Sequence, residues 1–174
     1  MSFAAQLDHS LDELDRGLAE KGLAHASREE ILGEYLLQVE AASESELLTS
    51  ILLLDDSGKH LVHGAAPSLP PEYCAAIDGL AIGPEAGSCG TAAFLGHSIY
   101  VTDIATDPLW RDFRDLALPH RLRACWSTPI LDDDGQVLGT FAVYYRTPRA
   151  PRPDDVEAIG RISRRVARAV TANR

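Results

Sequence analysis

Two β-hairpins, one near each end of the chain, constrain the fold more than any other feature of this sequence. The first spans residues 47–65 and reads LLTSILLLDDSGKHLVHGA, with β-favouring apolar residues on both sides of the turn cluster DDSG. The second spans residues 124–146, reads ACWSTPILDDDGQVLGTFAVYYR, and has the same plan around DDDG. Strands joined by so short a turn run antiparallel. The two hairpins therefore predict an antiparallel sheet as the framework of the fold.

Helical patterns lie before the first hairpin and after the second. Apolar residues spaced by three and four predict an N-terminal helix with one apolar stripe, formed by Leu7, Leu11, Leu14 and Leu18. The run SREE at residues 27–30 is a capping-box pattern and indicates the start of a second helix. A long C-terminal helix is indicated by a similar stripe, formed by Val156, Ile159, Ile162 and Val166.

The segment between the hairpins reads as short strands mixed with short helices. LAIG and HSIYVTDI favour strands, PEYCAAIDG and TAAFLG favour short helices, and ATDPLWRDFRDLALPHRLR reads as an irregular crossing. About six strands with hairpins at both ends favour an α+β fold over alternating βαβ units. We therefore expect a central antiparallel sheet of about six strands, with helices on both sides and long N- and C-terminal helices.

The charge of the chain narrows the range of its partners. Sixteen Lys and Arg against 26 Asp and Glu give a net charge of -10, which repels nucleic acid phosphates and anionic membranes. The sequence shows neither a signal-peptide pattern nor an apolar run long enough to span a membrane, so a cytoplasmic location is expected. Cys74, Cys89 and Cys125 fit neither a secreted disulfide framework nor a paired-cysteine zinc site, so reduced thiols are expected.

Four motifs, in this order, make the chain resemble a known family. They are GSCGTAA at 87–93, DIATDPLW at 103–110, WSTPI at 126–130 and GQVLGTFAVYY at 135–145. With their surroundings, over about residues 28–170, they resemble a GAF domain of the bacterial sensory type found in sensor kinases and cyclic-di-nucleotide enzymes. The resemblance implies a GAF/PAS-like sheet and a small-molecule pocket between one sheet face and the crossing segments. It leaves the ligand and any cofactor open, because members resembling this chain bind cyclic nucleotides, bilins, haem, nitrate or other small molecules, or have no known ligand.

The resemblance also implies a division of the chain into three parts. Residues 1–26 form an N-terminal helix, residues 27–150 form the GAF sensory core, and residues 151–174 form a C-terminal signalling and dimerisation helix. A homodimer through the terminal helices is expected. The output is expected to come from a kinase, cyclase or transcriptional partner or from a fused output domain, without direct contact to nucleic acid or membrane.

The stretch GSCGTAAF at residues 87–94 allows several interpretations. Its glycines precede a helix start, where backbone N–H groups can receive an anion, but the lysine of a phosphate-binding loop is missing. Cys89 falls in the first helical turn, where the helix dipole lowers the pKa of a thiol. The free methionine-(R)-sulfoxide reductases, a sister group of the same fold, also carry a cysteine in a GxCG loop. Because Cys74 and Cys125 do not match the further cysteines of those enzymes, a small structural residue is the alternative interpretation of Cys89.

The crossing segment and the strand after it supply most of the candidate ligand contacts. Large apolar residues occur there at irregular spacing, and they either fill the core or line a pocket. Strand alternation sends Trp126 and Thr128 to one sheet face and Cys125 and Ser127 to the other, so only one pair faces the pocket. With the first pair assigned to the pocket, the candidate ligand-binding residues are Cys89, Thr91, Asp107, Trp110, Phe113, Leu116, His120, Trp126 and Thr128.

Neither a metal site nor a catalytic residue is assigned. His60 and His63 have no partner at ligand spacing, and the acidic clusters lie in hairpin turns, where aspartate suits the backbone. Three hypotheses for the function follow. The first is a non-catalytic sensory module that binds a small molecule and signals through its terminal helices. The second is a thiol-based redox enzyme acting through Cys89, and the third is a ligand-free dimerisation scaffold.

Overall fold

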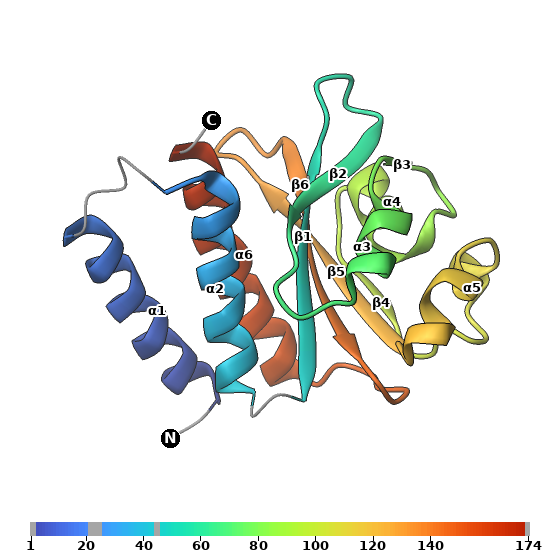
Figure 1. Ribbon diagram of the computed structural model, residues 1–174, viewed down its shortest axis with the longest axis horizontal. Coiled ribbons are helices and arrows are strands. Elements are labelled where there is room, and N and C mark those ends of the chain that lie inside the picture. Colours follow the sequence, from blue (N-terminus) through green and yellow to red (C-terminus); the bar gives the residue numbers. More distant parts are fainter. Residues whose placement is uncertain (1–2, 21–25, 44–45, 173–174) are drawn as a thin grey trace.

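The computed structural model describes residues 3–20, 26–43 and 46–172 of the chain. A six-stranded antiparallel sheet lies at its centre, in the strand order β3-β2-β1-β6-β5-β4 (Figure 1). This confirms the predicted α+β fold. The strands are β1 (Leu47–Leu54), β2 (His60–Ala65), β3 (Leu80–Ala81), β4 (Ile99–Val101), β5 (Ala124–Leu131) and β6 (Val137–Tyr145).

Both predicted hairpins form, and their turns use aspartate as expected. In the β1–β2 turn, the Asp55 carboxylate accepts hydrogen bonds from the backbone N–H of Lys59 at 3.2 Å and from the Ser57 hydroxyl at 2.7 Å. In the β5–β6 turn, the Asp132 carboxylate accepts from the backbone N–H groups of Asp134 and Gln136, both at 2.9 Å. A short acidic side chain thus replaces the sheet partners that the turn residues lack.

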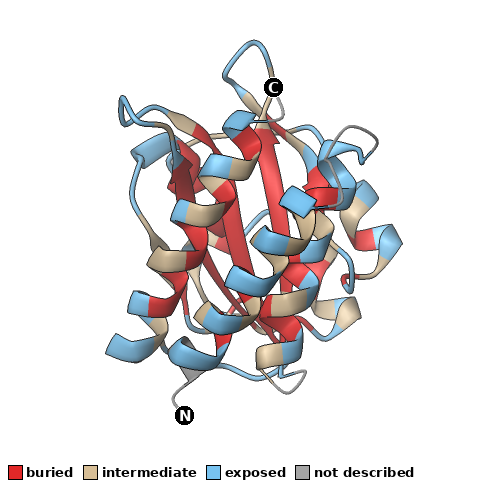
Figure 2. Ribbon diagram, turned by 90° about the vertical axis from the view of Figure 1, so that its left-hand side faces the viewer, coloured by how far each residue is buried: buried red, intermediate tan, exposed pale blue. Residues whose placement is uncertain are grey.

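Helices cover both faces of the sheet. The elements are α1 (Phe3–Glu20), α2 (Arg28–Ala42), α3 (Pro71–Ile77), α4 (Gly87–Leu95), η2 (Pro108–Trp110), α5 (Arg114–Ala117), η3 (Leu118–His120) and α6 (Pro153–Ala172). α2 and α6 pack on one face, and α1 lies outside them (Figures 1 and 2). The other face carries α3, α4 and the crossing segment with η2, α5 and η3. The predicted capping box of α2 is present, since the Ser27 hydroxyl accepts from Glu30 N and the Glu30 carboxylate accepts from Ser27 N.

The apolar stripes of the terminal helices pack against other elements of the same chain. Leu7 and Leu11 of α1 are buried against the helix layer, and Ile159 and Ile162 of α6 are buried in the core cluster on the sheet. Val156, which the sequence pattern places in the α6 stripe, is instead 41% exposed. It lies in the first turn of α6, and the buried stripe of the helix begins at Ala158 and Ile159.

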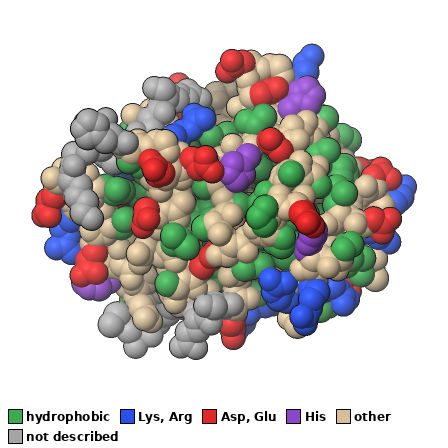
Figure 3. Space-filling model, in the orientation of Figure 1, with side chains coloured by type: hydrophobic (Ala, Val, Ile, Leu, Met, Phe, Trp, Pro, Cys, Tyr) green, Lys and Arg blue, Asp and Glu red, His purple; other side chains and the backbone are tan. Residues whose placement is uncertain are grey.

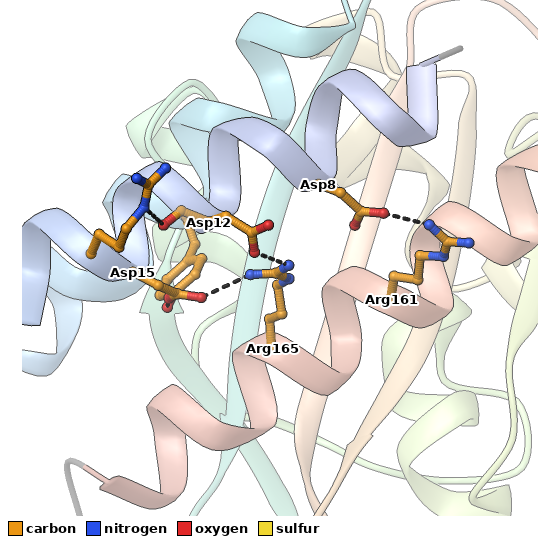
Figure 4. Close-up of polar contacts among 7 residues, drawn as sticks. Asp8, Asp12, Asp15, Arg161 and Arg165 are labelled. Carbon is orange, nitrogen blue, oxygen red and sulfur yellow. Dashed lines mark hydrogen bonds and ion pairs between the residues drawn. The ribbon is translucent and has the colours of Figure 1, made fainter. Parts of the chain in front are cut away.

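Ion pairs also hold α1 against α6 (Figure 4). Arg165 of α6 donates to Asp12 at 2.6 Å and to Asp15 at 2.8 Å, and Arg161 pairs with Asp8. The arginine-rich C-terminal helix therefore faces the acidic side of α1. No helix in the described part of the chain is both long and apolar enough to cross a membrane.

Candidate functional site

A small cavity lies between the sheet and the elements that cover its α3 and α4 side. We call it the α4 cavity, and its volume is about 40 Å³. Strand residues form its floor and three short helical elements form its walls. The lining residues are Leu52, Leu61, Tyr73, Ile77, Leu80, Ala81, Ala86, Gly87, Ser88, Cys89, Gly90, Trp110, Phe113 and Tyr144.

The first turn of α4 is fastened to both neighbouring elements. The Ser88 hydroxyl donates to the backbone oxygen of Cys125 at 3.0 Å, and the indole N–H of Trp110 donates to the same hydroxyl at 3.0 Å. Gly87 has φ +65°, a left-handed conformation that favours glycine, and a Cβ there would lie 3.7 Å from the Trp110 ring. α4 begins at Gly87, so the glycine loop belongs to the helix. The sequence pattern predicts this helix only from Thr91. A chain of hydrogen bonds joins η2, α4 and β5.

Two cysteine thiols contact the same serine hydroxyl behind this turn. Cys89 Sγ lies 3.0 Å from the Ser127 hydroxyl oxygen, and Cys125 Sγ lies 3.7 Å from the same oxygen. Both cysteines are buried, and Cys89 lines the cavity. The hydrogen bond from Cys125, followed by that from Ser127, lowers the pKa of the Cys89 thiol, although burial opposes the shift. Burial raises the pKa of the Cys125 thiol well above its usual value.

Two buried tyrosines supply neutral polar groups to the cavity. The hydroxyls of Tyr73 and Tyr144 lie 2.9 Å apart, and their rings meet edge to face with centroids 5.7 Å apart. Burial raises the pKa of both phenols well above the usual value, so both stay protonated at neutral pH. A ligand in the cavity therefore meets hydroxyl, thiol and indole groups. The phenols and the indole among them are uncharged.

No charged side chain lines the cavity among the described residues. On the crossing segment, the Arg114 guanidinium donates to the backbone oxygens of Ala105 at 2.9 Å and Asp107 at 3.4 Å. An anionic ligand would lose its hydration here without gaining a cationic partner, which disfavours its binding. The described residues also contain no cluster of three or more His, Cys, Asp or Glu able to hold a metal ion.

Three of the predicted ligand-binding residues line the cavity, and four others lie on its side of the sheet without lining it. Cys89, Trp110 and Phe113 are in the lining. The Thr91 hydroxyl is buried and accepts a hydrogen bond from Ala86 N at 3.0 Å. The others take structural positions: Asp107 caps η2 by accepting from Leu109 N at 2.9 Å, Leu116 packs against the core cluster, and the His120 ring lies 6.0 Å from the Tyr73 ring.

The assignment of Trp126 and Thr128 to the pocket is wrong. Trp126 belongs to the core cluster under α2 and α6, where its indole N–H donates to the backbone oxygen of Arg149 at 3.0 Å. Thr128, two residues along β5, shares that face and accepts from the Ser98 hydroxyl at 3.1 Å. The opposite pair, Cys125 and Ser127, faces α4. Strand alternation separated the two pairs correctly, but it carries no information on which helices cover which face.

Sequence reasoning missed the two tyrosines. The sequence pattern places Tyr73 only in a short amphipathic helix and Tyr144 only in a hairpin strand. They come from α3 and β6, 71 positions apart in the chain. The one available signal was that a buried tyrosine needs a hydrogen-bond partner.

A family model provides the identification. The GAF domain model matches residues 25–171, which is most of the chain. The chain belongs to the GAF domain family. The motifs at 87–93, 103–110, 126–130 and 135–145 thus correspond in this GAF domain to α4, the crossing, β5 and β6.

One sequence relative and two solved structures illustrate what this GAF domain is similar to. The chain is 40% identical over 136 residues to the methyl sulfide methyltransferase-associated sensor of Methanosarcina acetivorans, covering 77% of this chain and 13% of that much longer protein. Free methionine-R-sulfoxide reductase from Neisseria meningitidis, solved with its substrate, superposes with a TM-score of 0.74 at 17% identity, over 99% of this chain and 93% of that one. The GAF domain of a phosphoenolpyruvate-protein phosphotransferase from Coxiella burnetii gives a TM-score of 0.75 at 15% identity, over 98% and 96%. At such identities, the two structural matches show the fold alone.

Proposed function

We propose that this GAF domain is a non-catalytic sensory module that binds a small uncharged molecule in the α4 cavity. The observation that carries the proposal is the cavity itself, which has apolar walls, a few convergent hydrogen-bonding groups and no charged lining residue. The 40% identity to a protein named as a sensor supports the sensory role. On the face shown in Figure 3, hydrophobic side chains are interspersed with polar and charged ones.

The size of the cavity sets the size of the ligand. At about 40 Å³, and with roughly 10–15 Å³ needed for one water molecule, the space suits a molecule of about three or four heavy atoms. A cyclic nucleotide or a haem is far larger and would require Trp110 and Phe113 to move outward with the crossing segment. The candidate contacts are the lining residues Cys89, Trp110 and Phe113 together with Tyr73 and Tyr144.

Strand β5 provides a route for the signal. α4 packs on one face of β5 and α6 packs on the other. Cys125 and Ser127 of β5 contact α4, while Trp126 between them lies under α6. A ligand that displaces the first turn of α4 therefore alters the surface on which α6 rests. The result is a shift between two arrangements of the C-terminal helix. A dimer partner or an output domain, such as a kinase, cyclase or transcriptional regulator, responds to this shift.

Methyl sulfide is a suitable first probe, because it appears in the name of the relative and has three heavy atoms and no charge. The purified full chain is first examined by native mass spectrometry and by ultraviolet-visible spectroscopy for a retained molecule. Thermal unfolding is then followed at increasing methyl sulfide concentration. We expect the midpoint to rise with concentration, because a ligand that binds only the folded state stabilises it.

A matched pair of variants connects the effect to the cavity. Leu61→Trp places a large ring in the cavity lining, while Leu131→Trp adds the same ring at a position that is 40% exposed. The first substitution should abolish the midpoint shift and the second should preserve it, with circular dichroism used to check folding. If no molecule is retained and methyl sulfide leaves the midpoint unchanged, the ligand-free scaffold hypothesis is favoured instead.

A thiol reductase is the second candidate function, because Cys89 lines the cavity and the fold matches a methionine-R-sulfoxide reductase solved with its substrate. The test is reduction of free methionine-(R)-sulfoxide by the wild-type chain and by Cys89→Ser, with Cys74→Ser as the control. Turnover that depends on Cys89 alone would overturn the non-catalytic proposal.

A further inference from the structure

Cys89 and Cys125 form a pair that only the folded chain brings together. Cys89 lies in the first turn of α4 and Cys125 lies on β5, and both sulfurs contact the hydroxyl of Ser127, at 3.0 Å and 3.7 Å. The two thiols also interact, since each shifts the pKa of the other. Cys89 lines the α4 cavity, whereas Cys125 lies behind it and is fully buried.

We propose that Cys89 and Cys125 form a reversible intramolecular disulfide when a peroxide enters the α4 cavity. This modification goes beyond the proposed binding function and does not depend on it. Cys89 is the thiol that a molecule in the cavity reaches first, and Cys125 is the thiol placed to resolve the product. The cavity has room for the two oxygen atoms of hydrogen peroxide.

The reaction balances with hydrogen peroxide as the oxidant. Cys89 Sγ attacks one peroxide oxygen, the O–O bond breaks, and the departing hydroxide leaves as water with the thiol proton, which produces a sulfenic acid on Cys89. Cys125 Sγ then attacks Cys89 Sγ, the S–O bond breaks, and the hydroxyl leaves as a second water with the proton of Cys125. The two thiols are oxidised to a disulfide, and one peroxide is reduced to two waters.

The position of the cavity assigns the two roles in this order, because Cys89 lines it and Cys125 does not, and the pKa directions agree. The hydrogen bonds from Cys125 and Ser127 lower the pKa of the Cys89 thiol and increase its thiolate fraction, which favours it as the attacking group. Burial keeps the pKa of Cys125 high and its thiol protonated. The Ser127 hydroxyl, in contact with both sulfurs, is placed to pass the proton between them.

A disulfide here would tie α4 covalently to β5 at the cavity wall. Ser88 already fastens the same two elements through its bond to the backbone of Cys125. Oxidation would thus hold the first turn of α4 more tightly against β5. Cys74 provides the internal control, because it lies on α3, is partly buried, and burial raises the pKa of its thiol.

The test treats the full wild-type chain with hydrogen peroxide and follows its mass, followed by peptide mapping without reduction. We expect the loss of two hydrogen atoms, a single crosslink between the peptides of Cys89 and Cys125, and recovery of the original mass with dithiothreitol. A crosslink that includes Cys74, a crosslink between chains, or an unchanged mass would overturn the proposal. This measurement needs no variant, so it cannot fail through misfolding.

Variants then separate the two roles. Cys125→Ser should stop at the sulfenic acid on Cys89, detected as a dimedone adduct, while Cys89→Ser should show neither adduct nor crosslink. Cys74→Ser should behave as the wild type. A dimedone adduct on Cys125 in the Cys89→Ser variant would contradict the assigned order. Methionine sulfoxide is absent from all of these reactions, so their outcome is distinct from that of the reductase assay.

Discussion

Gly139 of β6 occupies a position where the backbone of β1 leaves no room for a side chain. A Cβ built there would lie 2.1 Å from the carbonyl oxygen of Leu52 and 2.9 Å from the Cα of Leu53. We expect Gly139→Ala to lower the free energy of unfolding by about 3 kcal/mol, because backbone atoms cannot yield as a flexible side chain can. Urea unfolding measures the loss.

Gly33→Ala is the matched control for this substitution. Gly33 lies inside α2, and nothing lies within 4 Å of the position that its Cβ would take. Alanine in a helix interior is favoured over glycine by about 1 kcal/mol, so this variant should gain stability. Equal losses at the two positions would contradict the steric argument.

Glu40 is a buried carboxylate whose role is structural. It is 7% exposed, and it accepts hydrogen bonds from the backbone N–H of Thr49 at 2.9 Å, from the Thr49 hydroxyl at 2.8 Å and from the Ser68 hydroxyl. Glu40→Ala leaves these buried donors without a partner and should cost about 2–3 kcal/mol in the free energy of unfolding. The exposed Glu34 on the same helix is the control, and Glu34→Ala should change stability by less than about 0.5 kcal/mol.

At the scale of elements, ion pairs add to the buried Leu7 and Leu11 contacts that attach α1. Its described contacts are with α2 and α6, and Arg165 joins it to α6 through Asp12 and Asp15. Arg165→Gln should therefore speed amide hydrogen exchange in residues 3–20 by about five- to tenfold while the sheet is unaffected. Arg164→Gln, which removes the same charge from the adjacent exposed position, should leave the exchange of α1 unchanged.

The same contact predicts a pH dependence. The hydrogen bond and positive charge of Arg165 lower the pKa of Asp12 below its usual value of 3.8. The pKa of Asp12 is lower in the folded chain than in the unfolded chain. The stabilisation that the Asp12–Arg165 pair contributes is therefore complete above about pH 3.8 and is lost as the pH falls through the folded pKa. The protection of α1 amides, taken relative to the intrinsic exchange rate at each pH, should fall in this acidic window and also at high salt. Acceleration at alkaline pH beyond the intrinsic exchange rate would contradict the assignment.

At the scale of the whole molecule, the described part of the helix layer leaves two large apolar side chains exposed, one on α2 and one on α6. Leu37 of α2 and Val156 of α6 are exposed by 44% and 41%, while the main stripes are buried within the chain. We expect a homodimer through the terminal helices, detected by light scattering after size-exclusion chromatography at twice 18.8 kDa. Leu37→Glu should weaken it, whereas Phe94→Glu, at a position 53% exposed on α4, should not. A wild-type mass equal to one chain would refute this proposal.

Much of this architecture could be predicted from local patterns. The two hairpins followed from alternation around DDSG and DDDG, the start of α2 from Ser27 and Glu30, and α6 from its apolar period. These features depend on contacts between residues within a few positions of one another, so a short stretch of sequence is enough to predict them. The GAF resemblance supplied the expected place of the pocket, and three of the nine predicted contact residues line the α4 cavity.

The sequence by itself determined that Cys125 and Ser127 share one face of a strand and that Trp126 and Thr128 share the other, because successive side chains of a strand alternate. Only the tertiary structure decided which face meets α4 and which meets α6. It also brought Cys89 to Cys125 and Tyr73 to Tyr144. Such contacts depend on how helices far apart in the chain divide the two faces of the sheet between them. That division is set by the packing of the complete core, and no local spacing contains it.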